Sequence, residues 1–133
     1  MLPGRRQVLL QDELVNINET AQWRVQTNAT VSIDSTGRNA TLSLGGKNLI
    51  AQILSPAGVT FSNLPASRTD KAPPIGPGMQ DMDNSPATVL AIDIPAGTNT
   101  IQVLFNPQWD DFTDFVTPPS VALDDWTLTS HNT

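Results

Sequence analysis

The stretch TVSIDSTGRNATLSLGGKNLIAQILS, residues 30–55, decides the fold class of this chain. Val31 and Ile33 alternate with polar residues, Ser-Thr-Gly at 35–37 supplies a turn, and the alternation then resumes in the run NATLSL. A period of two on both sides of a glycine-containing turn predicts a β-hairpin.

The second half of this stretch extends the hairpin into a sheet. Gly45 and Gly46 form the kind of pair that a tight two-residue turn prefers. The run KNLIAQILS, residues 47–55, is apolar at successive positions and not only at alternate ones. Such a run is typical of a central strand that is covered on both faces.

Further strand-like runs lie on both sides of this stretch, and no segment has the i, i+3, i+4, i+7 apolar stripe of an amphipathic helix. They are RQVLLQDELV (6–15), AQWRVQT (21–27), VTFSNL (59–64), ATVLAIDIPA (87–96), TIQVLFNP (100–107) and SVALDDWTLTS (120–130). Eight or nine short strands with turns between them predict an all-β protein, an antiparallel β-sandwich. Trp23, in phase with Val25, is expected in its core.

Two segments interrupt the regular pattern. Residues 65–87 hold five prolines and exceed the usual length of a connection, which predicts a functional or mobile loop. In the last run the apolar phase shifts between Leu123 and Trp126, and one extra residue at Asp124–Asp125 would restore it. This predicts a β-bulge in a final strand, with Trp126 in the core.

Composition limits the classes of function. With 133 residues the chain has the length of one domain, expected to span residues 1–133. The net charge is −6 and the seven basic residues are scattered, so no nucleic-acid partner is expected. No apolar run approaches the roughly 18 residues of a membrane-spanning helix, so no membrane partner is expected either.

Glycosylation signals indicate secretion. Asn18, Asn28 and Asn39 each begin an N-x-Thr sequon, and cysteine is absent, so disulfides do not bear on the compartment. The start, MLPGRRQVLL, has too short an apolar segment for a signal peptide. Sequons without a signal peptide predict an extracellular domain that is a piece of a longer secreted protein.

Residues suited to catalysis are sparse. Tyr and Cys are absent, and the one histidine, His131, is third from the end, so a serine nucleophile would lack a base elsewhere. Neighbouring carboxylates in a strand, such as Asp12 and Glu13, point to opposite faces and do not form an acid–base pair. No catalytic residue is assigned. Burial of Asp12 among its apolar neighbours would require an ion pair, for which Arg24 is the expected partner.

The stretch NPQWDDF, residues 106–112, is chemically the most suggestive. Trp109 follows a strand and a proline, and it is interpreted either as a lid on the end of the sandwich, which we favour, or as a platform for a sugar ring. Asp110 and Asp111 would then be the polar sugar contacts. Together with Asp114 they are also weak candidates for a calcium ion, because oxygen ligands in a loop suit this cation. No other cofactor is expected.

A resemblance to a known family extends this interpretation. The run RRQVLLQDEL, followed by AQWRVQTNATVSID and GRNATLSLGGKNLIAQILSP, resembles the C-terminal region of heparinase II/III-like proteins. The ending, VLFNPQW through VTPPSVALDDWTLTSHN, is similar to the tail of secreted members. The resemblance covers residues 5–131 and rests on strand patterns, not on catalytic signatures.

The resemblance implies a β-sandwich that follows an α-helical toroid in a polysaccharide lyase. Such lyases cleave uronic-acid polysaccharides by β-elimination, with Tyr and His usually moving the protons. No catalytic residue carries over, because Tyr is absent and His131 matches no catalytic position. The expectation is a non-catalytic domain that supports the catalytic part, with the polysaccharide bound through the N-terminal part of the protein. The alternative is a stand-alone carbohydrate-binding module that uses Trp109.

Overall fold

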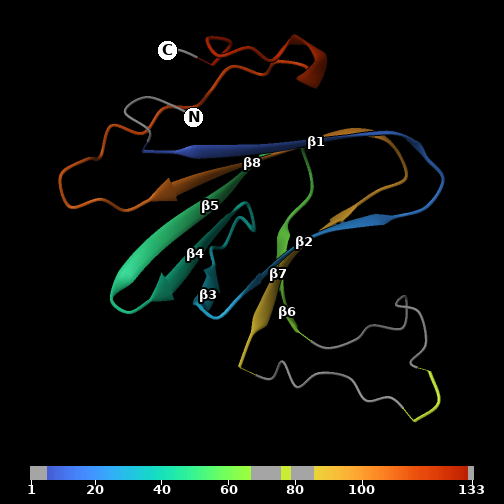
Figure 1. Cartoon of the computed structure of the whole chain (residues 1–133), viewed down its shortest axis with the longest axis horizontal. Coiled ribbons are helices and arrows are strands. Elements are labelled where there is room, and N and C mark those ends of the chain that lie inside the picture. Colours follow the sequence, from blue (N-terminus) through green and yellow to red (C-terminus); the bar gives the residue numbers. More distant parts are fainter. Residues whose placement is uncertain (1–5, 67–75, 79–85, 132–133) are drawn as a thin grey trace.

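The computed structural model of this chain describes residues 6–66, 76–78 and 86–131. Within them, two antiparallel sheets pack as a β-sandwich (Figure 1), which confirms the predicted fold class. The larger sheet has five strands in the order β1-β8-β5-β4-β3, and the smaller has three in the order β2-β7-β6. The strands are β1 (Val8–Ile17), β2 (Ala21–Thr27), β3 (Thr30–Ile33), β4 (Asn39–Leu44), β5 (Lys47–Ser55), β6 (Phe61–Pro65), β7 (Thr88–Ile94) and β8 (Gly97–Pro107).

The hydrophobic core lies between the two sheets. Ile53 and Val103 of the larger sheet meet Phe61 and Ile92 of the smaller one, and all four are buried. β5 lies between β8 and β4, so its predicted central place is confirmed, whereas Ile50 and Leu54 on its outer face are only half-buried. The expected core position of Trp23 also holds in part, because its half-buried ring packs against this cluster.

The predicted hairpin is formed by β3 and β4, with Ile33 opposite Ala40. Asp34 organises its turn: the carboxylate accepts hydrogen bonds from Thr36 Oγ1 at 2.7 Å and from Asn39 Nδ2 at 2.8 Å. These bonds stabilise the ionised form and lower the pKa of Asp34. The hairpin signal in the sequence is therefore backed by local side-chain chemistry.

The same turn fixes the passage from β5 in the larger sheet to β6 in the smaller one. Arg38 Nη1 donates to the carbonyls of Pro56 at 2.7 Å and Val59 at 2.9 Å. The amide of Phe61 donates to Gly37 O at 2.8 Å. One hairpin turn thus holds the chain where it changes sheets.

The predicted final strand is wrong. Residues 113–131, which we call the strap, contain a 3₁₀ turn at Leu123–Asp125 and no strand. The strap runs over the outer face of β1 and β8 (Figure 1). There is accordingly no β-bulge at Asp124–Asp125, and the expected core position of Trp126 is also wrong, since 38% of this residue is exposed.

Glutamine side chains explain why the strap is not a strand. Gln7 Nε2 donates to Val116 O at 3.0 Å, and Val116 N donates back to Gln7 Oε1 at 3.2 Å. Gln11 Nε2 donates to Val121 O at 2.8 Å. These amides stand up from the sheet face and bind the backbone of the strap, as a neighbouring strand would. The strap therefore lies on the face of the sheet and not at its edge.

The structure also bears on the expected Asp12–Arg24 ion pair and on the proline-rich loop. Asp12 is exposed on β1, whereas Arg24 lies in the other sheet and donates to Gln22 Oε1 at 2.6 Å, so the expected ion pair is wrong. Most of the proline-rich loop predicted at 65–87 falls outside the described residues.

Candidate functional site

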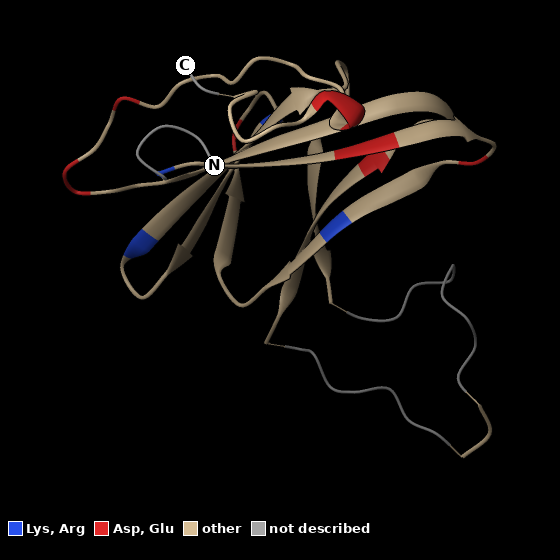
Figure 2. Cartoon of the chain, turned by 45° about the horizontal axis from the view of Figure 1, so that its top comes forward, with Lys and Arg blue, Asp and Glu red and all other residues tan. Residues whose placement is uncertain are grey.

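Charged side chains are dispersed over the described residues. Figure 2 shows the basic residues on separate elements, and they are Arg6, Arg24, Arg38 and Lys47. The described part of the chain also contains no helix of the length and apolarity that a bilayer crossing requires. The described basic residues therefore form no charged site, and the candidate site consists of aromatic and hydrogen-bonding groups.

The residues of the NPQWDDF stretch form a turn at the end of β8. Trp109 and Phe112 make an isolated antiparallel bridge, and Asp110 and Asp111 occupy the turn between them. Pro107 is the last residue of β8, and it lacks the amide that would continue the ladder. Trp109 therefore lies in a loop beyond the strand.

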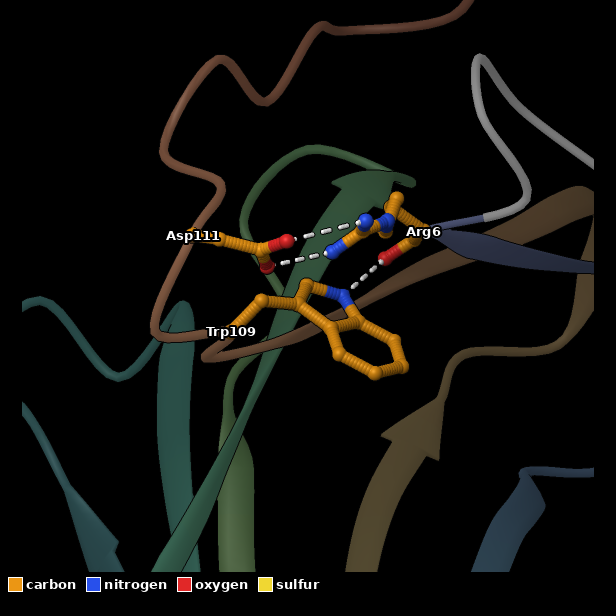
Figure 3. A network of polar contacts seen from close by, with 3 residues as sticks. All are labelled: Arg6, Trp109 and Asp111. Carbon is orange, nitrogen blue, oxygen red and sulfur yellow. Dashed lines mark hydrogen bonds and ion pairs between the residues drawn. The ribbon is translucent and has the colours of Figure 1, made fainter.

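Arg6, just before β1, closes onto this turn through both its backbone and its side chain (Figure 3). Trp109 Nε1 donates to Arg6 O at 3.0 Å. The Arg6 guanidinium donates to both carboxylate oxygens of Asp111, at 2.7 and 3.3 Å. Its Cζ lies 5.0 Å from the centroid of the Trp109 ring and 5.5 Å from that of Phe112, within cation–π range.

The ion pair between Arg6 and Asp111 orients the guanidinium but contributes little to the stability of the fold. The hydrogen bond from Arg6 lowers the pKa of Asp111, and the same bond raises the pKa of Arg6. The Asp111 side chain is 73% exposed, and an exposed pair contributes little free energy. The bidentate contact does orient the guanidinium, because both of its donors are directed at one carboxylate.

The indole of Trp109 is held in one orientation yet remains accessible. Its N–H is occupied by Arg6 O, and the guanidinium covers part of the ring, while 42% of the residue is exposed. The contacts with Arg6 are those of a lid that closes the end of the sheet. The exposed remainder is the apolar surface that a sugar platform needs, so both interpretations of Trp109 remain open.

The calcium candidates are not gathered into a set of ligands. Asp111 is engaged by Arg6, and Asp110 and Asp114 are exposed. Across the described residues there is no group of three or more His, Cys, Asp or Glu side chains that could hold a metal ion.

His131 takes part in the fold of the strap. Its ring packs edge-on against Trp126 at a centroid distance of 4.6 Å, and its Nδ1 lies 2.9 Å from Ser130 Oγ. These contacts belong to the last turn of the described chain, so the only histidine has a packing role there.

The three sequons differ in their surroundings. Asn18 and Asn28 are exposed in bends that follow β1 and β2. Asn39 is half-buried at the start of β4, and its Nδ2 donates to Asp34 Oδ2 at 2.8 Å. Since Nδ2 is the atom that would carry a glycan, the fold favours the first two sites over the third.

The sequence by itself does not specify the role of Arg6. The contact with Asp111 joins residues that are 105 positions apart, and no local signal reveals such a pair. The role of Gln7 has no signal in the sequence either, for the same reason.

No protein-family model and no curated protein matches this chain.

Proposed function

We propose that this chain is a non-catalytic β-sandwich domain of a heparinase II/III-like polysaccharide lyase. The full-length protein would cleave uronic-acid polysaccharides by β-elimination, and this domain would support the catalytic part. One observation carries the proposal furthest. The two distant stretches that resemble the family, RRQVLLQDEL and VLFNPQW, pair as β1 and β8 and meet again where Arg6 contacts Trp109.

The edge of the larger sheet suits a supporting role. β1 is the edge strand, and Leu10 lies opposite the buried Val103, so its side chain is on the core-facing side of the sheet. Even so, Val8 and Leu10 are 40% and 44% exposed. An exposed apolar edge is a surface that another domain can cover.

The test is an assay for unsaturated uronides by their ultraviolet absorbance. The chain by itself is expected to give no product from any uronic-acid polysaccharide, whereas a longer product of the same gene, carrying a helical toroid with Tyr and His, is expected to be active. Turnover by the isolated chain would contradict the supporting role. An upstream coding region without such a toroid would contradict the family assignment.

Secretion is part of this proposal and has its own test. Expression in a secreting eukaryotic host is expected to attach glycans at Asn18 and Asn28. Digestion with an endoglycosidase should then shift the mass of the wild type by two glycans, and the shift should be unchanged in Asn39→Gln. Asn18→Gln and Asn28→Gln should each lose one glycan. A chain secreted without any glycan would contradict the assignment as a glycoprotein.

A second candidate function is sugar binding by Trp109, which is supported by its fixed and partly exposed ring. A glycan array should show binding that Trp109→Ala abolishes and Trp109→Phe partly retains. Trp126→Ala is the matched control, because Trp126 is similarly exposed at 38%. Loss of binding on chelation would indicate that a calcium ion at the acidic turn takes part in sugar binding. A wild type that binds no glycan would exclude this function.

A further inference from the structure

A hollow of about 450 Å³ lies at one end of the smaller sheet, away from the Trp109 turn. Its lining comes from the segment before β2, from the β5–β6 connection, from β6, and from the end of β7. The residues are Thr20, Ala57, Gly58, Val59, Thr60, Ser62, Asp93 and Pro95. Most of these residues are exposed, so the hollow is an open surface site and not an enclosed cavity.

The strand register explains why polar groups converge there. Ile92 and Ile94 point into the core, so Asp93 between them points outward from the sheet. Phe61 lies opposite Ile92, and continuing this register by one residue places Thr60 opposite Asp93. The hydroxyl of Thr60 and the carboxylate of Asp93 therefore stand on the same face.

The carboxylate of Asp93 is held from one side. Gln22 Nε2 donates to Asp93 Oδ1 at 2.8 Å, and Gln22 Oε1 in turn accepts from Arg24 Nη1 at 2.6 Å. Within the described residues, Asp93 Oδ2 has no protein donor. One oxygen is thus fixed by the sheet while the other remains an acceptor for a ligand.

Hydroxyl groups also line the hollow. Thr20, Thr60 and Ser62 make no side-chain hydrogen bond to any other described residue. Elsewhere hydroxyls are used within the fold, as when Ser55 Oγ donates to Thr100 O at 2.7 Å. Because a hydroxyl can both donate and accept, these groups match the alcohols of a polyhydroxylated ligand.

We propose that this hollow binds a neutral pyranose. Asp93 would accept hydrogen bonds from two adjacent sugar hydroxyls, the kind of charge-assisted contact that is stronger than a neutral one. Thr60 and Ser62 would bind further hydroxyls, and the exposed Ala57 and Pro95 offer apolar surface to the C–H groups of the ring. The site does not depend on the proposed lyase function or on Trp109.

Charge sets the specificity of this site. A uronate would bring its carboxylate toward Asp93 and the negative charge of the chain, so it is expected to bind more weakly than the neutral sugar. The hollow is therefore expected to select against acidic sugars, so its ligand differs in charge from the polysaccharide that a lyase of the proposed class would cleave.

The experiment is a titration of the ¹⁵N-labelled chain with methyl glycosides of neutral hexoses and with methyl glucuronide, followed by amide chemical shifts. With a neutral sugar, saturable shifts are expected at residues 57–62 and 93–94, with a dissociation constant on the order of 1 mM. Asp93→Asn should weaken binding by about tenfold, since it removes the charge but keeps an acceptor for Gln22. Thr60→Val and Ser62→Ala should each weaken it a few-fold, and Asp12→Asn, on the other sheet, should leave it unchanged.

Several results would overturn the proposal. They are the absence of saturable shifts with every neutral glycoside, equal binding by Asp93→Asn and wild type, and binding of the glucuronide as tight as that of the neutral sugar. If Asp93→Asn fails to fold, Thr60→Val and Ser62→Ala decide, because each removes one hydroxyl without creating a charge. None of these outcomes bears on whether a longer protein has lyase activity.

Discussion

At the scale of single residues, the buried side-chain amide of Gln7 binds the backbone of the strap in the way that a neighbouring strand would. It is 1% exposed, and its Nε2 donates both to Asn106 Oδ1 at 2.7 Å and to Val116 O at 3.0 Å. Its Oε1 accepts from Val116 N, so all of its main hydrogen-bonding groups are satisfied. The carboxamide offers a donor and an acceptor together, so it can bind both the carbonyl and the amide of Val116.

Replacing Gln7 by Ala should lower the free energy of unfolding by about 2–3 kcal/mol, since the half-buried amide and carbonyl of Val116 and the side chain of Asn106 would lose their hydrogen-bond partner. Gln26→Ala is the matched control, because Gln26 is exposed on β2, and it should change stability by less than about 0.5 kcal/mol. Urea denaturation measures both. Equal effects of the two substitutions would mean that the strap does not depend on Gln7.

Asp111 supplies a prediction for pH. Its pKa is lowered in the folded chain by the hydrogen bond from Arg6, so the ion pair stabilises the fold above the unfolded-state pKa of about 3.9. This stabilisation is lost as the pH falls through the folded-state pKa. Thermal melts should therefore show wild type slightly above Asp111→Asn at neutral pH, with the difference vanishing in acid. A difference that grows toward low pH would contradict the pairing.

At the scale of elements, the hairpins are stabilised by local interactions and the strap by long-range ones. The β3–β4 and β4–β5 hairpins depend on neighbouring residues and on glycines with positive φ, such as Gly45 at 58° and Gly46 at 76°. The strap depends on Gln7, Gln11 and Gln102, which are distant in the sequence. The apolar spacing of the strap resembles that of a strand, but Leu123, Trp126 and Leu128 of that pattern are exposed.

The exposure of Leu128 tests whether the C-terminal segment is a buried strand or a strap on the sheet face. Its exposure is 102%, so Leu128→Ser should change the free energy of unfolding by less than about 0.5 kcal/mol. Leu104, on the face that the strap covers, is 1% exposed, and Leu104→Ala should cost about 2–5 kcal/mol. Chemical denaturation of both variants tests the arrangement. A cost at Leu128 close to that at Leu104 would restore the buried final strand.

At the scale of the whole molecule, the two sheets are joined where the β3–β4 turn meets the chain that enters β6. A Cβ added at Gly37 would lie 2.7 Å from Thr60 Cβ, and the φ of Gly37 is +73°. Gly46 has a similar φ of +76°, but a Cβ there would meet nothing within 4 Å. Substitutions at Gly37 and Gly46 therefore separate the cost of a left-handed backbone from the cost of disturbing the contact between the sheets.

Gly46→Ala should cost about 1 kcal/mol, the penalty of a left-handed conformation for an L-residue. Gly37→Ala should cost that amount plus roughly 1–3 kcal/mol, because Thr60 and the β5–β6 connection must move to admit the methyl group. Equilibrium unfolding in urea gives both values. Equal costs at the two glycines would show that the approach of Thr60 to Gly37 is loose.

The candidate site was predictable only in part. A tryptophan after Pro107 indicates an exposed loop residue, and this position is observed for Trp109. The partner of Asp111 and the orientation of the indole come from Arg6, at the opposite end of the chain. Asp93 gave no signal at all, because a single carboxylate in an alternating strand is the ordinary pattern of a solvent-facing side.

The sequence by itself determined what depends on near neighbours: the all-β class, the β3–β4 hairpin, the glycine turn at 45–46 and the central place of β5. Periodicity and turn chemistry act over a few residues, so they can be read without the fold. The tertiary structure decided what depends on distant partners: the strap on its glutamines, Arg6 over Trp109, and the polar hollow around Asp93. These contacts arise only once the β1–β8 pairing and the sheet register bring remote residues onto one face.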